Sequence, residues 1–283
     1  MMDDIVRVRR GGSPLILSMP HAGTEIPQEV ARRLNETGLA VPDTDWWIPR
    51  LYDFADALDP TVVEARLSRY VVDVNRDPSG TSLYPGQATT ELCPTTTFDG
   101  EPIYQDGMAP GALETGIRRD RYFWPYHIAL RSEIDRVREA HGYALLYDCH
   151  SIRSVVPRLF EGPLPVFSIG TNGGQSCAPE IEAAITAALA EAPQDEGSEM
   201  DLGYVVNGRF KGGWITRHFG EPDMRVHAVQ MELAQKAYML EAPPWTYDED
   251  KAAQTRPVLR GVLDALVEAG ARIAGAPNEG GNR

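Results

Sequence analysis

The segment Tyr143–Tyr147 (YALLY) decides the fold, because it is a nearly continuous apolar run that ends abruptly at Asp148-Cys149-His150-Ser151. A run of this kind is typical of a strand that is buried on both faces of a parallel sheet. Further short apolar runs predict the other strands, which we expect at Pro14–Met19, Val62–Glu64, Tyr70–Val74, Pro165–Ile169, Tyr204–Val206 and Val226–Leu233.

Segments with a helical spacing of apolar residues separate these runs. Helices are predicted over Trp46–Leu58, from Pro125 to Gly142, around Ile181–Leu189 and from Val258 to Ile273. Strands that alternate with helices predict an α/β fold in three layers, with a mixed, mostly parallel sheet covered by helices on both faces. We expect a single domain over residues 1–275 and a disordered tail at residues 276–283.

Two segments follow neither pattern. Asp77–Gly116 is rich in Gly, Pro and Thr and predicts a long connection, and loops of this length in compact domains are often functional. Pro193–Met200 is polar and predicts a second, shorter loop. We therefore look for functional groups in the first of these segments as well as at the ends of the strands.

The composition excludes several classes of protein and partner. The net charge of −14 disfavours nucleic acid and anionic membranes as partners, because phosphate binding needs clustered Lys and Arg. No apolar run approaches the ~18 residues of a membrane span, and Met1–Arg10 lacks the apolar core of a signal peptide. The cysteines Cys93, Cys149 and Cys177 are sparse and far apart, which is typical of a reducing compartment. We therefore expect a cytoplasmic protein.

Polar side chains gather where the predicted strands stop. In open α/β sheets, ligands bind outside the carboxyl ends of the strands, so side chains at these ends are expected to form one site. The polar residues at or next to strand ends are His21, Asn75, Arg76, His150 and Glu232.

Structural roles stay open for each of these residues taken singly. Arg76 suits a surface ion pair, which is the commonest fate of an arginine. Asp148 could accept hydrogen bonds from loop amides, and Asp43 and Asp45 could cap the helix that follows them. Glu232 lies in an apolar stretch, where an ionised carboxylate is costly unless an ion pair or a metal ion stabilises it.

Several common catalytic motifs are absent from the sequence. It contains no G-x-S-x-G nucleophile elbow, no H-E-x-x-H and no Walker A motif. The glycines of Gly170–Gly174 and Gly208–Gly213 do not fit G-x-G-x-x-G, so they favour loops over a dinucleotide-binding site.

Taken together, the motifs of the chain resemble the N-formylglutamate deformylase family, the amidohydrolases of histidine degradation. They occur in the family's order between Pro14 and Met239. The family is more distantly similar to aspartoacylase and the zinc carboxypeptidases, which implies a catalytic domain with a zinc-carboxypeptidase or phosphorylase/hydrolase-like fold. The motifs are Pro20–Gly23, Pro42–Trp46, Asp73–Arg76, Asp148–Arg153, Asn207–Gly213 with Ile215–His218, and His227–Gln235.

The resemblance implies one divalent metal ion, which we expect to be zinc. His21 and His150 correspond to the family's two histidine ligands, and two imidazoles with one carboxylate are a standard catalytic set. The carboxypeptidase pattern H-x-x-E fails here because position 24 is Thr24. The deformylase motif places the acid at Asp45, with Glu25 as the alternative.

The resemblance also assigns the remaining roles. Glu232 corresponds to the general base, which takes a proton from water and passes it to the leaving nitrogen. Arg76 binds a substrate carboxylate as a bidentate fork, with Asn75 beside it. Glutamate has two carboxylates, and we expect Arg217 to bind the second, with Arg209 and Lys211 as alternatives.

These roles imply hydrolysis of a small acidic N-acyl amino acid, N-formyl-L-glutamate, to formate and L-glutamate. Two other functions stay open. One is deacylation of another N-acyl amino acid or a carboxypeptidase-like cleavage, because the sequence does not report the size of the pocket. The other is a metal-free binding protein on the same scaffold, although such a protein has no need of a general base such as Glu232.

Overall fold

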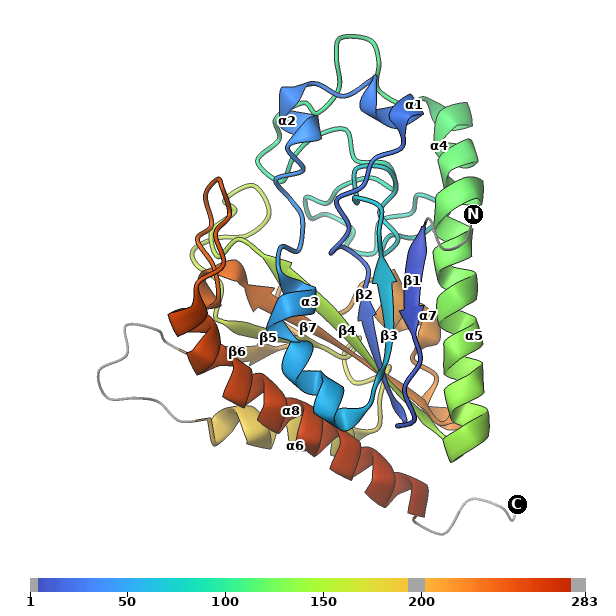
Figure 1. Ribbon diagram of the computed structural model, residues 1–283, viewed down its shortest axis with the longest axis vertical. Helices are drawn as coiled ribbons and strands as arrows, with labels where there is room; N and C mark the ends of the chain where they lie inside the picture. Colours follow the sequence, from blue (N-terminus) through green and yellow to red (C-terminus); the bar gives the residue numbers. More distant parts are fainter. Residues whose placement is uncertain (1–4, 193–201, 276–283) are drawn as a thin grey trace.

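The computed structural model describes residues 5–192 and 202–275, which contain a seven-stranded mixed sheet (Figure 1). The strand order is β1-β3-β2-β4-β7-β5-β6. β3, β2, β4 and β7 are parallel neighbours, whereas β1 and β5 run antiparallel to β3 and β7, and β6 is parallel to β5. The strands are β1 Val6–Arg9, β2 Leu15–Met19, β3 Thr61–Ala65, β4 Ala144–Ile152, β5 Phe167–Gly170, β6 Tyr204–Val206 and β7 Val226–Ala234.

Helices cover both faces of this sheet. α5 and α7 pack on one face, and α3, α6 and α8 pack on the other (Figure 1). The α-helices are α1 Gln28–Ala31, α2 Glu36–Leu39, α3 Ile48–Leu51, α4 Ala112–Arg118, α5 Trp124–His141, α6 Pro179–Ala190, α7 Trp214–Phe219 and α8 Glu249–Gly275. A π-helical turn, Arg119–Phe123, joins α4 to α5, and short 3-10 helices occupy Asp53–Leu58, Pro222–Met224 and Gln235–Ala237.

The sheet separates two apolar cores, because successive side chains of a strand face opposite sides. In β2, Leu15 and Leu17 belong to the core that α8 covers, whereas Ile16 belongs to the core that α5 covers. The central strands β4 and β7 are buried along their whole length. The continuous apolar runs in the sequence follow from this double coverage.

The predicted α/β class with helices on both faces of a mixed sheet is confirmed. The predicted strands that became β2, β3, β5, β6 and β7 agree with the structure to within two residues at each end. The predicted helices from Pro125 to Gly142, around Ile181–Leu189 and from Val258 to Ile273 correspond to α5, α6 and α8. Gly142 ends α5 with φ +80°, a left-handed conformation that glycine adopts without strain.

β4 continues beyond the apolar run, through Asp148 and His150 to Ile152. It does so because β7 runs beside it over the whole of this segment, with His150 opposite Glu232. Asp148 and His150 therefore lie inside β4 and not beyond the strand end that we predicted at Tyr147.

Tyr70–Val74 is buried but forms no strand, and that prediction is wrong. Its backbone groups bond to loops and side chains instead of a neighbouring strand. Asp73 N donates to Leu92 O at 2.8 Å, and His127 Nε2 donates to Val74 O at 2.8 Å. An apolar run reports burial, and burial without strand pairing produces the same pattern.

The predicted helix over Trp46–Leu58 is also wrong as a single element. It is divided into α3 and the 3-10 helix Asp53–Leu58, and α3 begins after Trp47, which has φ +63°. The long connection predicted over Asp77–Gly116 ends earlier, where α4 begins at Ala112.

Some sequence-based predictions lie outside the described residues. These are the polar loop at Pro193–Met200 and the tail at residues 276–283. Within residues 5–192 and 202–275, no helix is long and apolar enough to cross a membrane. The single-domain organisation over residues 1–275 stays a prediction.

Candidate active site

Two histidines and one aspartate converge beside the carboxyl ends of β2 and β4. His21 follows β2, His150 lies within β4, and Asp45 precedes α3. One ligand atom from each of these buried residues lies within 4.8 Å of the others. Asp45 Oδ2 is 3.7 Å from His21 Nδ1 and 3.2 Å from His150 Nδ1, so both rings present the same nitrogen to one carboxylate.

Each histidine is held from behind by a buried carboxylate. His21 Nε2 lies 2.7 Å from Asp73 Oδ1, and His150 Nε2 lies 2.8 Å from Asp148 Oδ2. A carboxylate at Nε2 favours the tautomer with its proton on Nε2, which leaves the Nδ1 lone pair available to a metal ion. Ser18 Oγ fixes Asp148 in turn, because it donates to Asp148 Oδ1 at 2.7 Å.

This donor set fits a metal ion. His21 Nδ1 and Asp45 Oδ1 are buried and have no hydrogen-bond partner among the described residues. Burial raises the pKa of Asp45, but the neighbouring His150 and His21 outweigh burial and hold that pKa below its ordinary value. The carboxylate is therefore ionised, as metal binding requires. The group His21, Asp45 and His150 could hold a metal ion.

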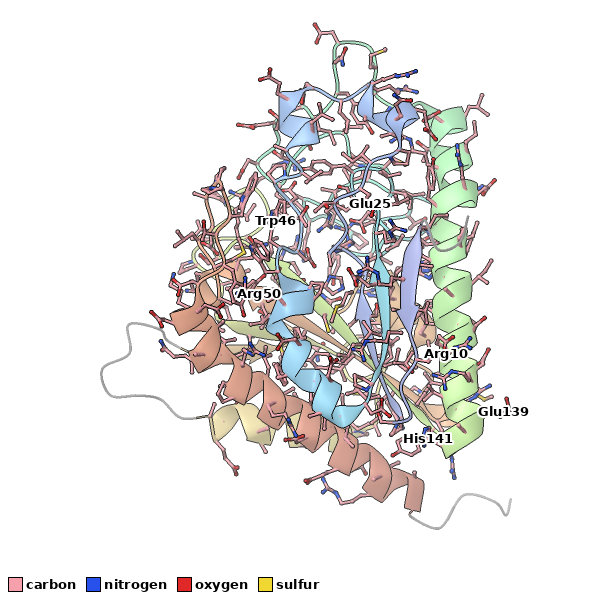
Figure 2. All side chains as sticks on the ribbon, in the orientation of Figure 1. Arg10, Glu25, Trp46, Arg50, Glu139 and His141 are labelled. Carbon is pink, nitrogen blue, oxygen red and sulfur yellow. The ribbon has the colours of Figure 1, made fainter. Side chains whose placement is uncertain are left out.

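The structure separates the two acids that compete for the position of third ligand. Glu25, labelled in Figure 2, has a half-exposed side chain that pairs with Arg66 Nη2 at 2.9 Å. Asp45 is only 1 % exposed and lies against both histidines. It does not cap α3, because that helix has Trp47 at its N-cap and no side-chain cap; instead Asp45 accepts from Ser151 N at 3.1 Å.

Glu232 lies in β7 directly beside His150 of β4. It is buried, and Gln230 Nε2 donates to Glu232 Oε2 at 3.2 Å. Burial raises the pKa of Glu232 to about 7; the charge on His150 opposes this rise and that on Asp45 adds to it. A carboxyl group with a pKa near neutrality can both accept and return a proton.

A cavity of about 60 Å³ opens beside these groups. The long connection after Arg76 forms part of its wall, through Tyr84, Thr90 and Phe98. Both histidines and Glu232 line the cavity as well. The cavity therefore joins the two candidate histidine ligands to the predicted base, and the long connection contributes to the site as its length suggested.

Three guanidinium groups reach this cavity, those of Arg69, Arg76 and Arg209. Arg76 is one-quarter exposed, and its Nη2 donates to Thr90 Oγ1 at 3.0 Å. Arg209 Nε donates to Leu159 O at 2.8 Å, and its Nη2 donates to Ala88 O at 2.9 Å. Arg209 thus reaches the cavity with its orientation fixed by two backbone carbonyls.

Arg217 and Lys211 are not among the residues that line the cavity. Arg217 Nε donates to Gly212 O at 2.9 Å, and its guanidinium carbon lies 5.0 Å from the ring centroid of Tyr84. Tyr84 itself faces the cavity and also contacts Arg209, whose guanidinium carbon is 5.3 Å from the ring centroid. The structure therefore brings Arg209 into the cavity and places Arg217 behind Tyr84.

Asn75 is held in place by α7 and by Gly213, the residue directly before α7. Asn75 Oδ1 accepts from Ile215 N at 2.8 Å, and Asn75 O accepts from Trp214 N at 3.2 Å. A Cβ atom at Gly213 would lie 2.3 Å from Asn75 Nδ2, so this position has no room for a side chain. Asn75 lines the cavity, and its Nδ2 atom lies 3.0 Å from His150 Nε2.

Sequence reasoning missed Arg69, Asp73 and Gln230 as parts of this site. Arg69 is 6 % exposed; its Nη2 donates to Asp73 Oδ2 at 2.6 Å and its Nη1 lies 3.7 Å from Asp45 Oδ1. Arginine is rarely buried without a partner, so the spacing of Arg69 and Asp73 by four residues next to a predicted site was the available signal.

Comparisons with known proteins identify the family of this chain. The family model of N-formylglutamate amidohydrolase matches residues 13–239. The chain is 48 % identical to N-formylglutamate deformylase of Pseudomonas putida over 95 % of this chain and 98 % of the relative. It is 49 % identical to the Pseudomonas aeruginosa protein of that name over 94 % of this chain and 97 % of the relative.

A solved structure has the same fold. The crystal structure of N-formylglutamate amidohydrolase from Ralstonia eutropha JMP134 aligns with a TM-score of 0.72 at 22 % identity, over 96 % of this chain and 97 % of that one. This likeness concerns the fold alone, whereas the family model and the Pseudomonas relatives identify the family. The chain is therefore an amidohydrolase and belongs to the N-formylglutamate amidohydrolase family.

Proposed function

We propose that this protein hydrolyses N-formyl-L-glutamate to formate and L-glutamate with one zinc ion. The observation that carries the proposal is a single cavity lined by His21, His150, a buried Glu232 and three arginines, with Asp45 buried beside both histidines. The names of the two Pseudomonas relatives support the same substrate. His21, Asp45 and His150 would hold the metal ion, and Glu232 would serve as the base.

Bound there, a zinc ion would polarise the formyl oxygen and lower the pKa of the attacking water. Glu232 then accepts a proton from that water and returns it to the leaving nitrogen, so that the carboxyl group ends as it began. Gln230 keeps Glu232 in place through its hydrogen bond to Oε2. Arg69, whose Nε is buried without a partner among the described residues, holds Asp45 and Asp73 together by charge.

The substrate is a dicarboxylate, so it requires two cations. Arg76 can bind one carboxylate with its planar fork, next to Asn75. For the second carboxylate we propose Arg209, because it lines the cavity. Burial lowers the pKa of Arg209, and an anion beside it would offset that cost. The predicted role of Arg217 would require it to act from behind Tyr84.

We also propose that this reaction is the last step of a histidine degradation route in the cytoplasm. The route rests on the family resemblance. The compartment rests on the cysteines, because Cys93, Cys149 and Cys177 are all free and buried. The small-molecule partner that we propose for this site is the substrate, N-formyl-L-glutamate.

The first experiment is a comparison of two substrates on zinc-loaded protein. Formate release from N-formyl-L-glutamate should exceed acetate release from N-acetyl-L-aspartate by several orders of magnitude in kcat/KM. Preference for the acetylated compound would favour a deacylase of another N-acyl amino acid. Tight binding of N-formyl-L-glutamate without turnover, by protein that retains no metal, would favour a binding protein.

The third metal ligand gives a prediction of its own. Asp45→Asn should weaken zinc affinity by at least about 100-fold, because it removes a charged ligand. Mutation of residues that only hydrogen-bond to metal ligands already lowers metal affinity by ~10–100-fold. Glu25→Gln is the matched control and should leave the affinity unchanged, because Glu25 pairs with Arg66 at the surface. Competition with a chelator measures both values. A larger loss in the Glu25 variant would return Asp45 to a structural role.

Carboxylate recognition gives a further prediction. Arg76→Lys and Arg209→Gln should each raise KM by at least about tenfold, because a bidentate charged hydrogen bond is lost. Replacing the carboxylate that Arg209 binds by an amide should then lower kcat/KM much less in the Arg209 variant than in the parent. Arg217→Gln is the control, and we expect its KM to stay within about threefold of the parent. A reversed pattern, with Arg217 sensitive and Arg209 not, would restore Arg217 as the second cation.

A further inference from the structure

A row of large apolar side chains is exposed along the helix formed by α4, the π-helical turn and α5. This continuous helix lies along one side of the molecule, at the opposite side of the sheet from α8 (Figure 1). Leu113 is 82 % exposed, Ile117 50 %, Trp124 39 % and Ile128 57 %. Scattered exposed apolar residues are normal, but four large ones on one helix face form a candidate contact surface.

The row is one face of the helix and not a chance scatter. Between residues 113 and 128, the exposed positions are these four apolar residues together with Asp120 and Arg121. Each of the six lies three or four residues from another one, so they share one face of the helix. The opposite side is buried against the core through Arg118, Tyr122 and Tyr126.

The order of the exposed residues is symmetric about the point between Asp120 and Arg121. Leu113 lies as far before this point as Ile128 lies after it, and Ile117 and Trp124 are placed in the same way. We propose that this face is the interface of a two-fold homodimer in which the helices of two copies pack antiparallel. A two-fold interface uses the same patch on both copies, so a residue before the axis must complement the residue that lies equally far after the axis in the second copy.

Antiparallel packing about that point satisfies this requirement. Leu113 of one copy then faces Ile128 of the second copy, and Ile117 faces Trp124. At the axis, Asp120 of each copy faces Arg121 of the other, which places opposite charges together twice. An unrelated partner protein would not require a symmetric order, so the symmetry favours a second copy of this chain.

The two charged residues are available for this exchange. Asp120 accepts from Arg119 Nε at 3.0 Å, and Arg121 Nη1 donates to Glu29 at 2.8 Å. The side chains of Asp120 and Arg121 are 65 % and 62 % exposed, and ion pairs at such positions contribute little. Pairing across the axis therefore replaces weak contacts by contacts shielded from water between apolar neighbours.

The interface is tested by sedimentation velocity at protein concentrations from a few micromolar to several hundred micromolar. The wild-type chain should shift with concentration from its monomer mass of 31.2 kDa toward twice that mass. Asp120→Arg places four arginines at the axis, and Arg121→Asp places four aspartates there. Each variant should weaken the dimer by at least about tenfold, because like charges meet at the centre of the interface.

Mixing the two variants tests the two-fold pairing itself. A dimer of one Asp120→Arg chain and one Arg121→Asp chain regains an opposite charge at every axial contact, so the mixture should associate although neither variant does alone. The double variant Asp120→Arg/Arg121→Asp should likewise dimerise. Thermal melting of each variant separates loss of association from loss of folding.

The apolar contribution is tested by Ile117→Asp, which should weaken the dimer by at least about tenfold. Leu240→Asp is the matched control, because Leu240 is 49 % exposed and lies outside the helix. A wild-type chain that stays monomeric at every concentration would overturn the proposal. So would a dimer that tolerates the single charge variants, or a folded mixture of the two that fails to associate.

Discussion

Replacing Glu232 by Gln is expected to lower kcat by at least about 10²-fold while zinc content and folding stay intact. General acid–base catalysis contributes about 10²–10⁴-fold, and glutamine preserves the shape of the side chain but accepts no proton. Glu232 is buried beside His150, and burial raises its pKa to about 7, as suits a group that takes a proton and returns it. Turnover of N-formyl-L-glutamate, zinc content and Tm should be measured on one preparation.

Glu133 offers a matched control for this experiment. It is 3 % exposed and pairs with Arg10 and Arg136, but it lies on α5, away from the cavity. Glu133→Gln should lower the Tm and leave kcat nearly unchanged. If Glu232→Gln behaved in the same way, with near-normal turnover in zinc-loaded protein, Glu232 would be a structural residue and the mechanism would be wrong.

Loss of either histidine ligand should abolish metal retention. His21→Ala and His150→Ala each leave two ligands of three, and an incomplete set does not hold zinc against dilution. We expect less than about one-tenth of the parent's zinc after desalting, as measured by elemental analysis, and kcat reduced to the same extent or further. The reason lies in the geometry, because the Nδ1 atoms of both rings face the same oxygen of Asp45.

The control for the histidine variants is another buried histidine. His127 is 4 % exposed and stacks on Phe123 with ring centroids 4.1 Å apart. It does not belong to the candidate metal-binding group of His21, Asp45 and His150. His127→Ala should reduce stability and leave zinc content per folded chain unchanged. Stoichiometric zinc in folded His21→Ala and His150→Ala proteins would show that the ligands lie elsewhere.

Much of the fold follows from local patterns in the sequence. The run at Tyr143–Tyr147 is apolar on both faces because β4 is covered on both sides, and this coverage can be read from side-chain chemistry alone. Tyr70–Val74 has the same chemistry but no neighbouring strand. Whether a buried segment pairs depends on which strands reach it, and that is a property of the whole chain.

The sequence by itself determined the α/β class, six of the seven strands that the described residues form, the helices α5, α6 and α8, and several of the residues that meet at the site. Strand ends and motifs name His21, His150 and Glu232, because polar groups in apolar surroundings are costly without a purpose. The choices between similar residues were decided only by tertiary structure. Asp45 and Glu25 are both acids near His21, and only the path of the chain buries one and exposes the other.

The same holds for the arginines. Arg209 and Arg217 have the same chemistry, but the structure brings the first into the cavity and holds the second to Gly212 O behind Tyr84. Arg69 and Asp73 enter the site only because the segment between them folds back against His21 and Asp45. A sequence names the groups that are able to do the chemistry, whereas distance and burial depend on contacts between residues far apart in the chain, and these select the groups that can act together.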